Sequence, residues 1–267
     1  MTSRTLVARV IPPFPNRWRG VHMVERSILV QKSFWPVLVS GFFEPVFYLW
    51  AIGVGIGQLA GDVTFGGMAV PYDAYVAPAM LAASAMNGAV FESTNMFFKL
   101  KYGNTYEGVL STPMQPMDVA TGEIAFSLMR GTLYSLVFLL VMAVMGLIES
   151  PWGILALPAA MLVGLAFAAA GAAATTWMRS WQDLDLITLV TLPLFLFSAT
   201  FYPLDVYPPA IQVLTWFSPL FHGVVLIRSL TLGYLHWGLL INVAYLVIMA
   251  AIGLTITGRR IGTLLLK

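Results

Sequence analysis

The chain has 267 residues, of which 59% are hydrophobic and only 10% are charged, and its formal net charge is +2. This composition excludes a water-soluble domain, because too few polar side chains remain to cover a water-facing surface. The absence of cysteine excludes disulfides and thiolate metal sites, and we expect no metal site of any kind. The sequence therefore predicts an integral membrane protein.

Residues 1–36 predict a basic cytoplasmic arm that stays on the mature protein. The arm carries six Arg or Lys residues, with no apolar core before Phe34 and no small-residue cleavage site, unlike a signal peptide. Between Arg17 and Trp35, apolar residues recur at close to a helical period. This spacing predicts an amphipathic helix at the inner membrane surface. A plain basic juxtamembrane anchor is the alternative.

Six apolar stretches are long enough to cross a bilayer, whose hydrocarbon core of about 30 Å needs roughly 20 residues per helix. They are residues 37–59, 74–98, 124–148, 152–178, 184–204 and 237–257. A seventh stretch, residues 210–232, follows several prolines and is interrupted by Ser218 and Pro219. It predicts a broken, re-entrant or interfacial pair of short helices within an external segment, residues 205–236.

The distribution of basic residues decides between six and seven spans. With six spans, all but two of the 14 Lys and Arg residues fall on one side of the membrane. The positive-inside rule makes that side cytoplasmic. We therefore expect a single six-span domain, residues 37–267, with both termini in the cytoplasm.

The sequence shows no catalytic motif. It has no phosphate-binding loop, no H-E-x-x-H and no G-x-S-x-G, so we expect no catalytic residues. The glycine run at residues 53–57 favours close packing of helices over nucleotide binding.

The polar loop between the second and third spans predicts a short helix within residues 102–116. Asn104 and Glu107 have the spacing of a capping box, and Pro113 would end the helix. Tyr106, Val109 and Leu110 would share one face. A helix of about two turns is unstable alone in water, so this face must pack either on a partner protein or on the base of its own bundle.

Four separate regions together resemble the permease subunits of type-2 ABC exporters. The motifs are EPVFYL at residues 44–49, YGNTYEGVLSTPM at 102–114 with GE at 122–123, FYPLD at 201–205 and WFSPLFHG at 216–223. The resemblance covers nearly the whole chain, in the branch of nodulation lipo-oligosaccharide and daunorubicin-type drug exporter permeases.

The resemblance implies an all-α membrane protein with an N-terminal connecting helix, six spans, a coupling helix after the second span and short external helices before the sixth. It implies ATP-driven export of a glycolipid, a lipid-linked oligosaccharide or a hydrophobic drug across a bacterial inner membrane. Two ABC ATPase subunits would bind ATP and Mg²⁺, so the chain itself would be neither an enzyme nor a cofactor-binding protein.

The same resemblance implies a permease dimer, formed with itself or with a paralogue, in contact with membrane lipids and with no nucleic acid. It assigns coupling to the ATPase to one group of residues. These are Thr105, Tyr106, Glu107, Val109 and Leu110.

Three ionisable residues fall inside predicted spans, where an unpaired charge costs several kcal/mol. Glu92 and Arg130 should both lie in the cytoplasmic halves of neighbouring spans, and we expect them to pair. Alternatively, Arg130 extends to the head groups and Glu92 caps nearby backbone. Glu44 would brace the kink at Pro45 or the dimer seam, or contact the substrate.

Aromatic residues gather around the outer end of the fifth span. Most suit an interfacial belt, but a lining of the substrate path is the sharper hypothesis, since rings pack on sugars and acyl chains alike. The candidates are Phe197, Phe201, Tyr202, Trp216 and Phe221. The main competing function is an ion-coupled secondary transporter that uses intramembrane carboxylates.

Overall fold

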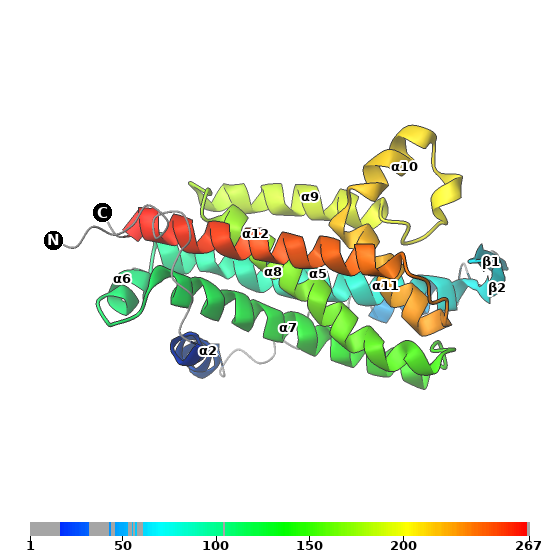
Figure 1. The fold of residues 1–267 in the computed structure, drawn as a ribbon, viewed down its shortest axis with the longest axis horizontal. Coiled ribbons are helices and arrows are strands. Elements are labelled where there is room, and N and C mark those ends of the chain that lie inside the picture. The colour runs from blue at the N-terminus through cyan, green and yellow to red at the C-terminus, as the bar shows by residue number, and fades with distance from the viewer. Residues whose placement is uncertain are drawn as a thin grey trace.

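The computed structural model describes residues 17–31, 43, 46–52, 55, 57, 61–103 and 105–265. These residues form a helical bundle with one small β hairpin (Figure 1). The part of the chain described contains four helical runs that are long and apolar enough to cross a membrane. They are α5 (Tyr72–Lys101), α7 (Pro116–Val144), a 3-10 turn (Pro151–Leu155) continuing into α8 (Ala156–Thr175), and α12 (Leu239–Leu265).

Small residues allow the central helices to approach closely. A Cβ added at Gly131 of α7 would lie 2.9 Å from the carbonyl oxygen of Ala85 in α5. One added at Gly253 of α12 would lie 2.6 Å from the backbone of Ala169 in α8. Packing of this kind, rather than a hydrophobic effect, holds helices together in lipid.

The loop before α7 contains α6 (Thr105–Leu110) and ends in a reciprocal cap. The Gln115 side chain accepts from the backbone at Asp118, and the Asp118 carboxylate accepts from the Gln115 N–H at 2.9 Å. Pro116 occupies the first turn, where a missing N–H costs nothing. This cap explains why α7 begins eight residues before the apolar stretch predicted to start at residue 124.

A β hairpin follows the first predicted span and was not anticipated from the sequence. Strands β1 (Asp62–Phe65) and β2 (Met68–Pro71) pair antiparallel, with Val63 opposite Val70. The turn is Gly66–Gly67, with φ of 59° and 84°, values that favour glycine. The all-α expectation therefore holds for the bundle but not for this connection.

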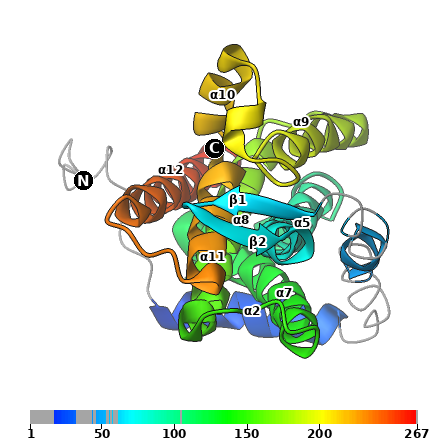
Figure 2. The same ribbon diagram turned by 90° about the vertical axis from the view of Figure 1, so that its right-hand side faces the viewer.

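Helix α9 (Leu184–Leu196) is shorter than the predicted fifth span, which was expected to reach residue 204. It ends early because side chains bind its last carbonyl oxygens. The Ser198 hydroxyl donates to Leu194, and the Thr200 hydroxyl donates to Phe195 at 2.7 Å. None of the side chains of α9 is buried, and the helix lies to one side of the bundle (Figure 2).

The predicted seventh apolar stretch forms two short helices. They are α10 (Pro209–Trp216) and α11 (Pro219–Leu232), which meet at 84°. Counted as one broken span, they bring the candidate spans among the described residues to five. Most of the first predicted span lies outside the described residues, although residues 46–52 are largely helical.

The elements define two ends of the molecule (Figure 1). The α6 end carries α6, the turn at residues 176–183 and the C-terminal end of α12. The hairpin end carries β1, β2, α10 and α11. Helix α2 (Arg17–Gln31) crosses α7 near the α6 end (Figures 1 and 2).

Candidate functional sites

The apolar face of α6 packs on the base of its own bundle. Tyr106 is 1% exposed and belongs to a buried cluster with Met23 of α2, Met96 of α5 and Ile124 of α7. The half-buried side chains of Val109 and Leu110 pack against the same cluster. The sequence left open whether this face packs on a partner protein or on the base of its own bundle. The structure shows that it packs on the bundle.

The opposite face of α6 is available to a partner. Glu107, Gly108, Ser111 and Thr112 are exposed, and Thr105 is partly exposed. Of the five predicted coupling residues, Glu107 is thus the most accessible, whereas Tyr106 acts as an anchor. The predicted capping residue Asn104 lies outside the described residues.

An ion pair between α5 and α7 lies close to the anchor of α6. Burial raises the pKa of the Tyr106 phenol well above its ordinary value, and the nearby negative charge of Glu123 raises it further. Glu123 Oε2 in turn lies 2.7 Å from Lys99 Nζ of α5. The ion pair connects α5 to α7, and the apolar packing of Tyr106 connects α6 to both helices.

The predicted pair of Glu92 and Arg130 is present, inside the bundle. Arg130 Nη1 lies 2.9 Å from Glu92 Oε2, and the side chains are 6% and 0% exposed. Arg130 Nε and Nη2 also donate to the Tyr134 hydroxyl at 3.1 and 2.9 Å, and the guanidinium lies 4.3 Å from the Phe91 ring centre. Arg130 therefore does not extend to the head groups. Glu44 lies outside the described residues.

The predicted aromatic path divides between two clusters at the hairpin end. Phe197, Phe201 and Tyr202 belong to one cluster, joined by ring contacts through Phe195 and Tyr207. The rings of Trp216 and Phe221 form the other with His222 and Tyr245. Phe221 is buried, while Phe197, Tyr202 and Trp216 are about half exposed. The five residues therefore do not form one continuous lining by ring contacts.

Arg228 of α11 holds the hairpin end together and was not identified as a site from the sequence. It is 1% exposed, and its guanidinium donates to the carbonyl oxygens of Tyr75 and Ala199 at 2.9 Å and of Thr200 at 3.4 Å. Its carbon centre lies 3.7 Å from the Tyr75 ring centre. The sequence signal for this site was a single arginine within the apolar stretch of residues 210–232.

His222 makes a second connection that sequence reasoning missed. Its Nδ1 lies 2.7 Å from Asn242 Oδ1 of α12, and its Nε2 lies 3.0 Å from the Trp216 carbonyl oxygen at the end of α10. The ring stacks on Tyr245 with centres 4.1 Å apart. One imidazole therefore connects α10, α11 and α12 at the bend between the two short helices.

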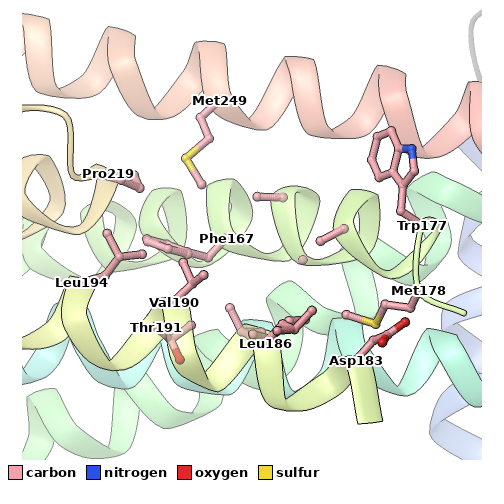
Figure 3. Close-up of a pocket in the computed structure, with 15 residues that line it drawn as sticks. Phe167, Trp177, Met178, Asp183, Leu186, Val190, Thr191, Leu194, Pro219 and Met249 are labelled. Atoms are coloured by element: carbon pink, nitrogen blue, oxygen red, sulfur yellow. The ribbon is translucent and has the colours of Figure 1, made fainter. Parts of the chain in front are cut away.

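An apolar cavity of about 590 Å³ separates α8 from α9 (Figure 3). Phe167 and Trp177 line it from the α8 side, and Leu186 and Val190 line it from α9. Asp183 lies at its α6 end. Its volume is within the range of sites that hold small ligands.

The apolar helices, the short helix between α5 and α7 and the broken helix before α12 form a bundle of the kind that crosses a membrane several times. Residues 21–232 match the model of the ABC-2 type transporter family, and the chain belongs to this family. It is therefore a multi-pass membrane protein, and its family implies an ABC ATPase partner. The predicted resemblance to type-2 ABC exporter permeases is confirmed.

Curated relatives cover most of the chain. It is 32% identical over 232 residues to Nodulation protein J of Rhizobium leguminosarum bv. viciae, covering 84% of this chain and 87% of the relative. It is 34% identical over 199 residues to Nodulation protein J of Rhizobium leguminosarum bv. trifolii, covering 74% of each. The protein of the same name from Rhizobium meliloti (strain 1021) is 30% identical over 229 residues, covering 84% of this chain and 86% of the relative.

Proposed function

We propose that the chain is the permease subunit of an ATP-driven exporter that moves an amphipathic substrate out across a bacterial inner membrane. The observation that carries this proposal is the two-sided character of α6. Its apolar face is anchored by buried Tyr106, while Glu107 and Gly108 are exposed. A helix too short to be stable alone is thereby held in a fixed position with one face free.

The anchor also supports a mechanism of coupling. An ATPase subunit that moved α6 would push on Tyr106, and through its packing on Met96 and Ile124 the motion would reach α5 and α7 together. Because the Lys99–Glu123 ion pair also joins these two helices, the displacement would pass to the spans as a rigid-body shift. The partner, which binds ATP and Mg²⁺, supplies the energy.

The proposed assembly has six spans, with residues 37–59 forming the first and the α6 end facing the cytoplasm together with both termini. Two permease chains, identical or paralogous, would bind two ATPase subunits. The segment containing α10 and α11 would then re-enter the membrane from outside, a geometry tolerated where irregular backbone is buried in protein.

The aromatic clusters at the hairpin end support the proposed substrate class. A glycolipid, a lipid-linked oligosaccharide or a hydrophobic drug would place acyl or ring carbon against these surfaces. An ion-coupled secondary transporter is less well supported. Among the described residues, Glu92 is already paired with Arg130, which weakens its case as a free proton or ion site.

A substitution at Gly108 tests the docking role of α6 without disturbing its anchor. A Cβ added there meets nothing within 4 Å, so Gly108→Trp should leave the permease folded and block the exposed face. We expect the tagged wild-type chain, purified in mild detergent from its native host, to bring ATPase activity with it. The variant should bind its ATPase roughly tenfold more weakly or worse, as for the loss of an interface hot spot.

The matched control is Gln182→Trp, which adds the same side chain at an exposed position in the other turn of the α6 end. This variant should retain the ATPase. Equal ATPase recovery with Gly108→Trp would contradict a docking role for α6. A wild-type chain that purifies with no ATPase in several mild detergents would instead favour ion coupling.

A further inference from the structure

Two neighbouring cavities form one groove on the side of α8 that faces α9 and α12. The first, of about 590 Å³, lies toward α9, and the second, of about 640 Å³, lies toward α12. The two cavities share the lining residues Ala170, Ala174, Trp177 and Met249. We call the combined space the α8 groove.

The α8 groove has the shape and chemistry of a site for a hydrocarbon chain. Alanines of α8 form its floor, and side chains such as Val190 of α9 and Ile252 of α12 form its walls. The floor runs from Phe167 to Trp177, and ten residues of helix are about 15 Å long. This length is roughly half the thickness of the hydrocarbon core of a bilayer. An acyl chain from one leaflet fits that length.

Next to the α6 end of the groove, Arg260 contacts the lining residue Trp177 and forms no ion pair with any described residue. The Arg260 guanidinium lies 5.0 Å from the ring centre of Trp177, and its Nη2 donates to the Thr176 carbonyl oxygen at 3.3 Å. Its buried Nε has no acceptor, and no carboxylate among the residues described lies within ion-pair distance of it. A half-buried guanidinium with a buried, unused donor favours an anion.

Asp183, the acidic residue in the lining of the groove, forms no ion pair with Arg260. The Asp183 carboxylate accepts from the backbone N–H groups of Arg179 and Ser180 at 2.7 and 3.2 Å. Those hydrogen bonds lower the pKa of Asp183, so its charge stabilises its own turn. Arg179 is exposed beside it and adds a second positive charge.

We propose that the α8 groove binds an anionic phospholipid of the inner leaflet, with an acyl chain along Ala170 and Ala174 and its phosphate at Arg260. Trp177 would lie at the level of the head groups, where tryptophan is enriched. Anionic lipids concentrate in the cytoplasmic leaflet. The choice of leaflet rests on the orientation proposed above, whereas the site itself does not depend on the ATPase.

Photoactivatable lipids test this site directly. The full-length chain in nanodiscs would be exposed to phosphatidylglycerol or phosphatidylcholine carrying a diazirine on one acyl chain, and cross-linked peptides would be located by mass spectrometry. We expect phosphatidylglycerol to label α8 and α12 within the groove. Arg260→Gln should lower that labelling roughly tenfold, the effect of losing a charge-assisted hydrogen bond, and Arg260→Lys should lower it less.

A variant that fills the groove provides a second test of the site. Ala174→Trp should abolish groove labelling, because the indole would occupy the floor of both cavities. The matched control is Ala251→Trp on α12, an exposed alanine outside the groove lining, and it should label as the wild type does.

Two results would overturn the proposal. Equal labelling by both lipids, unchanged in Arg260→Gln, would show ordinary bilayer contact without an anionic site. A groove labelled by neither lipid, with labelling elsewhere on the chain unchanged, would show that another surface, such as a second copy of the chain, covers it instead. Either result leaves the docking test at Gly108 unaffected, so failure of the lipid site and failure of the exporter function can be told apart.

Discussion

At the scale of single residues, the pair of Glu92 and Arg130 buries two charges inside the bundle, where a single unpaired charge would be strongly destabilising. Their side chains are almost fully buried and lie on neighbouring helices, α5 and α7. Tyr134 accepts two further hydrogen bonds from the guanidinium, and the Phe91 ring covers it. Removing either charge therefore leaves the other buried and uncompensated.

Charge-removing variants test this account. Glu92→Gln and Arg130→Gln should each destabilise the bundle by about 3–5 kcal/mol, and each should reduce export. The double variant should recover part of both losses, because neither charge is then isolated. Thermal unfolding in detergent and an export assay would be compared across the cycle. Single variants as stable as the wild type, or a double variant showing only the sum of the losses, would contradict the pairing.

The sequence could predict this pair but not the contacts of Arg228. Glu92 and Arg130 lie at helical positions whose depth follows from counting turns along two long spans. Arg228 binds carbonyl oxygens around Ala199, whose φ of 53° belongs to an irregular turn. Such a turn depends on tertiary contacts, which have no local pattern in the sequence.

At the scale of elements, the packing of α2 on α7 depends on a glycine. A Cβ at Gly122 would lie 2.4 Å from the Met23 Cβ and 3.0 Å from the Gly20 carbonyl oxygen. Neither the Cβ nor the backbone can move away without moving the helix. The position of α2 across α7 is therefore fixed by residue 122.

Gly122→Ala should displace α2, at an overpacking cost of about 1–3 kcal/mol. A single cysteine at Ser27, which is 4% exposed, would report the displacement, and the chain has no native cysteine to interfere. We expect maleimide to react several-fold faster in the Gly122→Ala background. Gly108→Ala, where the added methyl group has free space, serves as the control. An unchanged rate would show that α2 adjusts without moving.

The elements differ in how far sequence could predict them. α5 and the run of the 3-10 turn with α8 match their predicted spans closely, because a long apolar run leaves few alternatives in a bilayer. α7 begins eight residues before its predicted span, at a polar cap that the apolar pattern does not include. The end of α9 depends on hydrogen bonds from Ser198 and Thr200 and on the irregular turn that Arg228 holds at Ala199, so it could not be predicted locally. The hairpin did have a local pattern from which it could have been predicted, a Gly66–Gly67 turn between short strands.

At the scale of the whole molecule, the two ends should face opposite sides of the membrane. Gln182 lies exposed at the α6 end, and Asp205 lies exposed at the hairpin end. In inside-out vesicles, a membrane-impermeant maleimide should label Gln182→Cys and not Asp205→Cys, and intact spheroplasts should give the reverse. Labelling of both positions from the same side would exclude the proposed six-span orientation.

The shortness of α9 has a consequence for the surrounding lipid. Its 13 residues rise about 20 Å, whereas the hydrocarbon core is about 30 Å thick. A mismatch of this size is accommodated by thinning of the adjacent bilayer or by flanking groups that reach toward the interface. Where the bilayer thins beside α9, a polar head group has less hydrocarbon to traverse, and the barrier to its crossing falls on that side of the permease.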